Sequence, residues 1–547
     1  MGEDMSFDYK KIVPFAKKNW NWGLLILILI FGFYLMSYHI DYSVIGYHNW
    51  KETHYLTEAR NFADDGFFEH GFFVPAYDYP AIGSDPSGAH SDTFPTISIV
   101  GGLFFNIFGS SLFVARLISI LFSLGAVFFM YLLIKHLFKR EDLALLSCLI
   151  LAVLPLHIFF GRQFQLLSPA LFFCLGGLYF YFKWLKDFSW KYTILFSVFI
   201  GLGVLTKYTF ALFAFPMIFV FPYKKLLKKA YWKKYLFVFL VIALSLSWLL
   251  YIPSVSGTIG EELSTVNVGL VFESSFWQTM KYFFADNYTL LGLGMGLAGA
   301  FIFLAMFLKQ SGMRKKRAYK FMFFYLVGSL IWFVYTAEKL LGHNYHQYPL
   351  LPLVAFMMAY LIVFVGINMG SLFKFKWLKY VVIVIGLMLL ISPITDSKNR
   401  MFDTQFMGLD IAGDYLDENA LGDERVVHSS HQAYGLLWHG DIMGSRGIPD
   451  NVDDLIYAKD ELDANWLFIY NWDFGIMQDE RWDYISENYE LKQAAFTTDG
   501  NPLYLLLKYG GTFDINNINA MIDGQAMQTK TYEYSGGNVN VNYVNFA

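Results

Sequence analysis

A short segment near the N-terminus carries side chains suited to proton transfer. It reads HNWKETHYLTEARNF from His48 to Phe62. If residues 48–62 form a helix, His48, Glu52, Tyr55 and Ala59 share one face, because helical neighbours recur every three or four residues. A carboxylate with a histidine one turn away can accept a proton from a hydroxyl. An ordinary solvated surface helix has the same spacing, so spacing alone leaves both interpretations open.

Cations at the ends of apolar runs form a second group of candidate site residues. Arg162 and Lys207 each follow an apolar run, and the segment His343-Asn-Tyr345-His346 precedes another. Charged groups near a membrane span are costly and therefore mark functional sites, and a cation can stabilise negative charge that develops in a reaction. The alternative is a structural role, in which the cations anchor at the membrane interface and His and Tyr form an interfacial belt.

The elements that must position these groups are membrane helices. The chain is 56% hydrophobic and only 16% charged, and its apolar residues come in long runs, as expected of segments that cross a bilayer. The two cysteines, Cys148 and Cys174, lie inside such runs and form no metal motif. The sequence predicts about eleven transmembrane helices, at 23–39, 113–134, 142–160, 167–184, 191–206, 208–222, 235–253, 287–308, 320–336, 347–366 and 377–394.

Basic residues give these helices a direction. They crowd into alternate connections, for example 135–140 and 224–234, which predicts that those connections and the N-terminus are cytoplasmic. The apolar run 95–109 is too short to fit this alternation, and we interpret it as a helix on the membrane surface. The long connection 40–94, which also holds Asp41 and Asp92, is then the first outer loop.

The last part of the chain differs in charge and pattern. Residues 395–547 carry 25 acidic and 9 basic side chains, a net charge of −16, whereas the rest of the chain carries 20 and 32, a net charge of +12. Strand-like runs at 425–429, 466–470 and 503–508 alternate with helical stretches at about 451–463 and 479–488. We therefore predict a membrane domain at 1–394 and a small, acidic, extracytoplasmic α/β domain at 395–547. Its last 35 or so residues are expected to form a β-hairpin or to be loosely ordered.

Several motifs together resemble the GT-C glycosyltransferases, in particular the branch of protein O-mannosyltransferases and lipid A aminoarabinose transferases. The family has an acidic pair, then an aromatic residue and an alanine, after its first span; aligned on Tyr55 and Ala59, that pair falls on Lys51 and Glu52. His48-x-Trp-Lys51-Glu52 and the ending Ala-Arg60-Asn-Phe look like a prokaryotic sub-branch of the family. Downstream resemblances follow in order along residues 20–370: PTISIVGGLFFNIFG, ARLIS, GLGVLTKYT and GHNYHQYPLLPL.

The resemblance implies a GT-C fold and transfer of a sugar from a polyprenyl-phosphate donor to a protein, lipid or glycan acceptor, with inversion, at the outer face of the plasma membrane. Because Lys51 replaces the usual first acid, the base is expected to be Glu52, Asp92 or Asp41, in that order, assisted by His48. Lys51, Tyr55 and Arg60 are expected to contact substrate. Arg162, Lys207, His343, Tyr345 and His346 are expected to bind the donor phosphate.

No nucleotide-binding loop is present in the sequence, and the chemistry requires no cofactor. His48, Glu52, His90 and Asp92 offer metal ligands, but their spacing matches no metal motif, so no metal site is predicted. A ligase or polymerase of lipid-linked glycans is the alternative function. A transporter is less favoured, because the ionisable residues gather at the outer face and not at mid-membrane depth.

Overall fold

The computed structural model describes residues 9–76, 88–90, 93–256, 266–375, 377–400, 403–445, 447–534 and 537–546. Asp92 therefore lies outside the described residues. The chain forms two compact units. The helical unit comprises residues 1–38, 119–251 and 259–398, and the mixed unit comprises residues 39–118, 252–258 and 399–547. The break at 398/399 lies close to the predicted domain boundary, but residues 39–118, expected in the membrane domain, group with the C-terminal residues.

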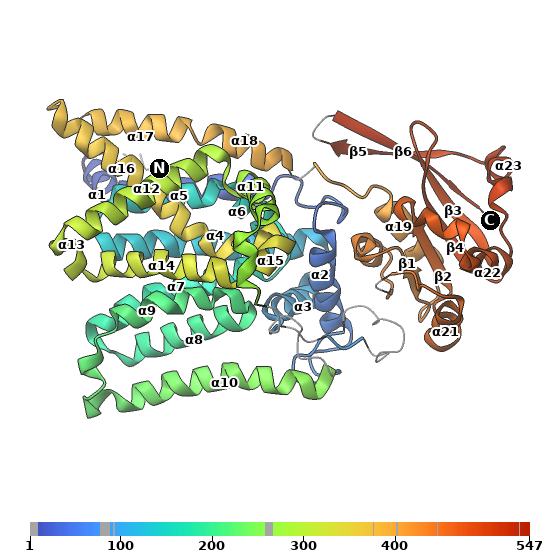
Figure 1. Cartoon of the computed structure of the whole chain (residues 1–547), viewed down its shortest axis with the longest axis horizontal. Helices are drawn as coiled ribbons and strands as arrows, with labels where there is room; N and C mark the ends of the chain where they lie inside the picture. Colours follow the sequence, from blue (N-terminus) through green and yellow to red (C-terminus); the bar gives the residue numbers. More distant parts are fainter. Residues whose placement is uncertain are drawn as a thin grey trace, which may run out of the picture. The chain divides into compact units, whose positions relative to one another are not determined.

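Among the described residues of the helical unit, the secondary structure is helical (Figure 1). The bounds of the helices are α1 (Tyr9–Met36), α4 (Leu112–Phe138), α5 (Glu141–Val153), α6 (Pro155–Arg162), α7 (Leu167–Asp187), α8 (Trp190–Thr206), α9 (Ala214–Val220), α10 (Trp232–Ser256), α11 (Ser274–Tyr288), α12 (Leu290–Lys309), α13 (Ser311–Lys315), α14 (Arg317–Tyr335), α15 (Ala337–Gly342), α16 (Leu351–Leu372), α17 (Leu378–Met388) and α18 (Ile391–Asn399). The first seven residues of α4, residues 252–256 of α10 and Asn399 of α18 belong to the mixed unit.

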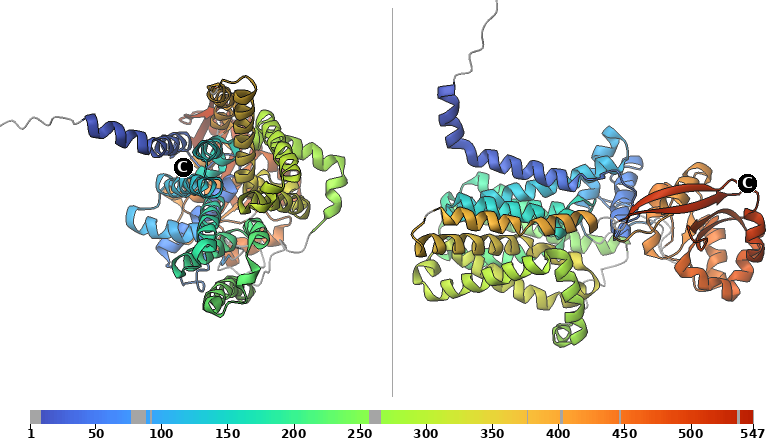
Figure 2. Two further views of the ribbon diagram at one scale, coloured as in Figure 1. Left: turned by 90° about the vertical axis from the view of Figure 1, so that its left-hand side faces the viewer. Right: turned by 90° about the horizontal axis from the view of Figure 1, so that it is seen from above.

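Long apolar helices confirm the predicted class, a polytopic α-helical membrane protein. Six of the described helices are long and apolar enough to cross a membrane, and the pair α5 and α6 adds a seventh if it forms one span. That pair bends by 60° at Leu154, whose backbone is extended because the next residue is proline. Shorter apolar helices include α3, α8 and the stretch 208–220, so the count of eleven spans stays a prediction. Figure 2 shows the helices of this unit from the end and from above.

The mixed unit contains a mixed sheet and shorter helices. Its elements are α2 (Asn49–Asp64), α3 (Thr96–Phe108), α19 (Leu409–Asn419), β1 (Val426–His428), α20 (Gly435–His439), α21 (Val452–Leu462), β2 (Trp466–Tyr470), α22 (Glu480–Asn488), β3 (Tyr489–Thr497), β4 (Pro502–Tyr509), α23 (Ile518–Ile522), β5 (Gln528–Tyr534) and β6 (Gly537–Asn545). The predicted α/β character is confirmed, and so is the hairpin near the end of the chain, where β5 pairs with β6.

The sheet has the strand order β1-β2-β4-β3-β6-β5 and a core on each face. β1 runs parallel to β2, and the other pairs are antiparallel. Along β2, Trp466, Phe468 and Tyr470 pack with α19 and α20, while Leu467 and Ile469 pack with α21 and α22. Because successive side chains point to opposite faces, a strand buried on both faces needs the continuous apolar run WLFIY.

The first core extends beyond the C-terminal residues. It includes Ile45, and Tyr42 and Trp50 pack against it. Asn49 at the start of α2 donates a side-chain hydrogen bond to the carbonyl of Gln432. The start of the first predicted outer loop and the sheet domain therefore share one hydrophobic core within the mixed unit.

Helix α3 packs closely along α2. A Cβ atom at Gly102 of α3 would lie 2.8 Å from Cβ of Phe62 and 3.1 Å from the carbonyl oxygen of Ala59. Ala59 and Phe62 are almost fully buried. Small residues at 59 and 102 thus let the two helices approach, and α3 in turn helps to fix the rotation of α2.

Candidate functional site

Glu52 is buried on α2 and paired with Arg116 of α4. Its Oε1 accepts from Nε of Arg116 at 2.8 Å and its Oε2 accepts from an Nη atom at 2.9 Å. The same guanidinium donates to the carbonyl oxygens of Ile40 and Tyr42. This two-point geometry holds the carboxylate in a fixed orientation. The structure therefore connects two motifs of the family resemblance, Glu52 and the Arg-Leu-x-Ser segment, which sequence spacing did not join.

The other predicted residues of this segment have well-defined positions. The helix begins at Asn49, one residue later than expected, and His48 precedes it in a left-handed conformation with φ 58° and its ring 3.9 Å from that of Tyr47. Tyr55 is buried. The ammonium of Lys51 lies 4.4 Å from the ring centre of Trp50. Their roles toward substrate stay predictions.

Arg60 contacts the C-terminal part of the mixed unit. Its Nε lies 2.8 Å from a carboxylate oxygen of Asp441, and it donates to the carbonyls of Leu437 and Trp438. The guanidinium also lies 5.1 Å from the ring centre of Trp438. The structure thus shows Arg60 linking α2 to α20, a contact that sequence reasoning missed because its partners are more than 370 residues away.

Asp41, the third candidate base, is exposed and borders a cavity of about 430 Å³. Arg60, Asp417, His439 and Asp441 line the same cavity, and Ser110, Ser111, Leu112, Phe113 and Trp438 complete it. Three carboxylates and a serine pair give this cavity a polar, acidic wall. Asp92, the second candidate base, lies outside the described residues.

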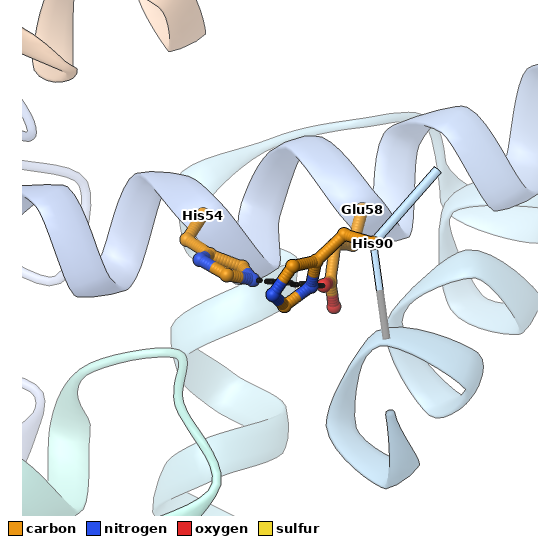
Figure 3. Close-up of side chains that lie close together, drawn as sticks. All are labelled: His54, Glu58 and His90. Carbon is orange, nitrogen blue, oxygen red and sulfur yellow. Dashed lines mark hydrogen bonds and ion pairs between the residues drawn. The ribbon is translucent and has the colours of Figure 1, made fainter. Parts of the chain in front are cut away.

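A cluster that the sequence did not predict occupies the next turn of α2. One oxygen of Glu58, Oε1, lies 2.9 Å from Nε2 of His54 and 2.9 Å from Nδ1 of His90, and the two nitrogens are 3.1 Å apart (Figure 3). The other oxygen, Oε2, accepts a hydrogen bond from Ser98 of α3. His54 and Glu58 are buried, and His90 is partly exposed. The available signal was the i,i+4 pair of His54 and Glu58.

Burial and charge set the protonation of this cluster. Burial lowers the pKa of His54, and the neighbouring His90 acts in the same direction, so His54 is neutral at pH 7. Burial alone would raise the pKa of Glu58, but the hydrogen bonds to His54 and His90 outweigh burial and hold that pKa below its usual range. The cluster therefore presents a carboxylate to two imidazole nitrogens in a largely buried position.

In the helical unit, Arg162 ends the bent helix pair. It is the last residue of α6 and is buried, as are Gln163 and Gln165, which hydrogen-bond to each other. The last turn of α6 is close-packed: a Cβ atom at Gly161 would lie 2.7 Å from Oγ of Ser123 and 3.3 Å from Oη of Tyr348. Close packing therefore fixes the position of Arg162.

Lys207 lies at the predicted turn. It separates α8 from the 3-10 helix η1 (Tyr208–Phe213) and has an extended backbone with φ −151°. The residue is only 6% exposed, and none of the described residues forms an ion pair with it. Burying an ammonium without a counterion is costly, so this position favours an anionic ligand.

The His-Tyr segment forms the 3-10 helix η6 (Asn344–Leu350), just after His343. Tyr345 and His346 are buried, and the ring of Tyr345 stacks on that of His343 at 5.1 Å. Asn287 of α11 donates hydrogen bonds to the carbonyl of Asn344 and the side chain of Gln347. Neighbouring helices therefore hold this segment, although it is short.

The structure brings the three predicted phosphate-binding segments together. Tyr345 lies edge-on to Phe160 of α6, with ring centres 5.8 Å apart. The hydroxyl of Tyr348 and Nδ1 of His157, also on α6, form a hydrogen bond of 2.9 Å. Phe210 of η1, three residues after Lys207, lies 6.5 Å from the ring of Tyr348. The helix ends that carry Arg162, Lys207 and His346 thus pack against one another within the helical unit.

Comparisons with known proteins show similarity to glycosyltransferases of membranes. Residues 92–251 match the family model of dolichyl-phosphate-mannose-protein mannosyltransferase. This segment contains α3 through most of α10, including Arg162 and Lys207. No curated protein matches the sequence. The fold is shared with solved structures of the glycosyltransferases ArnT and AftD, in agreement with the GT-C fold that the resemblance implied.

Particular solved structures share this fold. ArnT from Cupriavidus metallidurans bound to undecaprenyl phosphate is similar with a TM-score of 0.53 and 12% identity, over 96% of this chain and 98% of ArnT. Its apo state gives a TM-score of 0.55 and 12% identity, over 90% and 98% of the two chains. The arabinofuranosyltransferase AftD from Mycobacteria gives 0.51 and 14%, over 90% of this chain and 40% of AftD. At these identities the likeness establishes the fold.

Proposed function

We propose that this protein is a membrane glycosyltransferase that takes a sugar from a polyprenyl-phosphate donor and transfers it, with inversion, to an acceptor at the outer face of the plasma membrane. The observation that carries the proposal is Lys207, buried and without an ion pair among the described residues, on a segment packed with those of Arg162 and His346. The match of residues 92–251 to a family of dolichyl-phosphate-mannose-dependent enzymes and the ArnT structure with undecaprenyl phosphate support the same donor class.

The proposed reaction is a displacement at the anomeric carbon. The bond between this carbon and the phosphate oxygen breaks as the acceptor oxygen forms its new bond, and the electron pair leaves with the lipid phosphate. Lys207, Arg162, His343, Tyr345 and His346 stabilise the negative charge on that phosphate. Fixed cations stabilise such charge more effectively than water does, because they need no reorganisation during the reaction.

A carboxylate accepts the proton of the acceptor hydroxyl. Glu52, Asp92 and Asp41 remain the candidates for this base, and His48 assists it. Lys51, Tyr55 and Arg60, which lie close to Glu52 in the sequence, contact the substrate. Both oxygens of Glu52 already accept hydrogen bonds from Arg116, so a proton-accepting role for Glu52 requires competition with that ion pair. This contact favours testing Asp92 and Asp41 alongside it.

The test measures sugar transfer from radiolabelled polyprenyl-phosphate sugars in membranes that contain the full chain. Wild type is compared with Lys207→Ala, Glu52→Gln, Asp92→Asn and Asp41→Asn, and exposed Lys281→Ala on α11 is the matched control. We expect transfer by wild type and the control, a strong loss in Lys207→Ala and a loss in one of the carboxylate variants. If wild type consumes no lipid-phosphate sugar, the proposal fails. Transfer of a whole glycan instead of one sugar would identify the ligase or polymerase alternative.

A further inference from the structure

The cluster of His54, Glu58 and His90 has no assigned role in the proposed reaction. Its side chains come from α2 and from the described residues 88–90 (Figure 3), and Ser98 of α3 donates a hydrogen bond to Glu58. Its three facing atoms are Nε2 of His54, Oε1 of Glu58 and Nδ1 of His90. Each of these atoms lies within 2.9–3.1 Å of the other two.

Hydrogen bonds alone explain this triangle poorly. If both imidazoles donate to the same carboxylate oxygen, the two N–H groups lie side by side with their nitrogens only 3.1 Å apart. If His54 donates to His90 instead, the lone pair of His90 Nδ1 already serves that bond, and no proton lies between His90 and the carboxylate. Each proton arrangement leaves one close contact repulsive. A cation at the centre makes all three contacts attractive, because each atom offers it a lone pair.

The ligand types and distances fit a transition-metal ion. Two imidazole nitrogens and one carboxylate oxygen are a ligand set of zinc sites, with bonds of about 2.0–2.2 Å. Ligand atoms around such a tetrahedral ion lie about 3.3 Å apart, so the three atoms here need to separate by only a few tenths of an ångström.

The surroundings hold the three ligands in place. Ser98 donates to Oε2 of Glu58, which leaves Oε1 turned toward the histidines, the kind of outer hydrogen bond that orients metal ligands. His54 and Glu58 are one turn apart on a buried helix, so their spacing is fixed by the backbone. His90 is placed by its backbone N–H, which donates to the carbonyl of Pro75, and by the bridge between Ala76 and Ala89.

We propose that His54, Glu58 and His90 bind one divalent transition-metal ion, and that zinc is the ion this ligand set fits. The bound ion joins residues 88–90 to α2 and keeps a fourth coordination position for a water molecule or another oxygen ligand. The site is independent of the proposed function, since the sugar transfer described above uses none of its three ligands.

The test uses the full chain in detergent, purified through an affinity tag without histidines and stripped of metal. Zinc is then added, unbound ion is removed, and metal content per chain is measured by mass spectrometry. We expect one zinc ion per chain in wild type and in the control His70→Ala, which removes a partly buried histidine of the same connection. His90→Ala and Glu58→Gln are expected to lose at least 10-fold in zinc affinity. Zinc is also expected to raise the melting temperature of wild type but not of His90→Ala.

A second variant tests direct ligation without removing the ligand. His90→Cys supplies a thiolate, which binds zinc and cobalt, so cobalt-loaded His90→Cys is expected to show a thiolate-to-cobalt charge-transfer band that wild type lacks. Failure of stripped wild type to take up zinc would overturn the proposal whatever the variants do. Equal zinc content in folded His90→Ala and wild type, or no charge-transfer band in folded His90→Cys, would overturn it as well.

Discussion

Glu52 and Arg116 form a buried ion pair with two parallel contacts of 2.8 and 2.9 Å. Arg116 lies near the start of α4 and Glu52 lies on α2, so the pair fixes the helix that carries the first candidate base. Removing one partner of a buried pair costs about 3–5 kcal/mol because it leaves the other charge uncompensated.

The first prediction separates the structural role of Glu52 from a catalytic one. Glu52→Ala and Arg116→Ala are each expected to lower the melting temperature of the purified protein, and Glu52→Gln/Arg116→Met is expected to recover much of that loss because no lone charge remains. Sugar transfer is then measured on the recovered double variant. Full activity would exclude Glu52 as the base, whereas a folded but inactive protein would retain it.

The second prediction concerns Lys207. Lys207→Ala is expected to reduce the rate of sugar transfer by about 100-fold or more, because it removes a fixed cation near the departing phosphate, and Lys207→Arg is expected to keep part of the rate. Steady-state kinetics with a lipid-phosphate sugar donor measure both. Unchanged kinetics in Lys207→Ala would show that Lys207 contacts no donor phosphate.

The third prediction tests the close approach of α2 and α3. Gly102→Ala is expected to destabilise the protein by about 1–3 kcal/mol, the usual cost of overpacking, because the new methyl group would meet Phe62 and Ala59. The matched control is Gly294→Ala in α12, where a Cβ atom meets nothing within 4 Å. Thermal unfolding in detergent compares the two. Equal melting temperatures would show that α3 can shift away from α2 without cost.

The fourth prediction concerns pH. Burial lowers the pKa of His439 to about 4 in the folded protein, and its Nε2 accepts a hydrogen bond from the backbone N–H of Val44. The unfolded chain takes up this proton near pH 6.5, whereas the folded chain takes it up only near pH 4. The free energy of unfolding therefore decreases, by on the order of 3 kcal/mol, as pH falls through that interval.

The melting temperature should therefore fall between pH 6.5 and 4, and His439→Gln should reduce that dependence. Asp410 acts at lower pH, because Lys530 at 3.0 Å and the hydroxyl of Tyr532 overcome burial and lower its pKa. Its contribution is complete above the usual carboxyl range and is lost as pH falls below it. A steeper pH dependence in His439→Gln than in wild type would contradict the assignment.

The sequence was informative where a local pattern decides the structure. Long apolar runs predicted helices close to their observed positions, and the run 466–470 coincides with β2. β3 was missed because it follows α22 directly and carries Glu490, Lys492 and Gln493 among its apolar residues. The candidate site residues were chosen by type and spacing and stay predictions, but the segments of Arg162, Lys207 and His346 do pack together.

Contacts between distant segments escaped prediction. The partners of Glu52 and Arg60 lie 64 and about 380 residues away, and no local periodicity reports such a pairing. The histidine pair of His54 and His90 depends on where residues 88–90 pack, which tertiary contacts decide. The sequence also placed the first outer loop with the membrane helices, because chain order alone does not reveal which core a loop joins.

The core shared by Ile45, Trp50 and the sheet has a consequence for protein engineering and for sequence evolution. Deleting residues 399–547 would expose apolar surface at the start of α2 and remove the partners of Arg60, so it would also disturb the helix that carries Glu52. Residues 399–547 are therefore not a separate domain that can be removed without affecting the rest of the mixed unit. They and the segment 39–118 are expected to melt in one cooperative transition and to change together when one enzyme of this kind diverges from another.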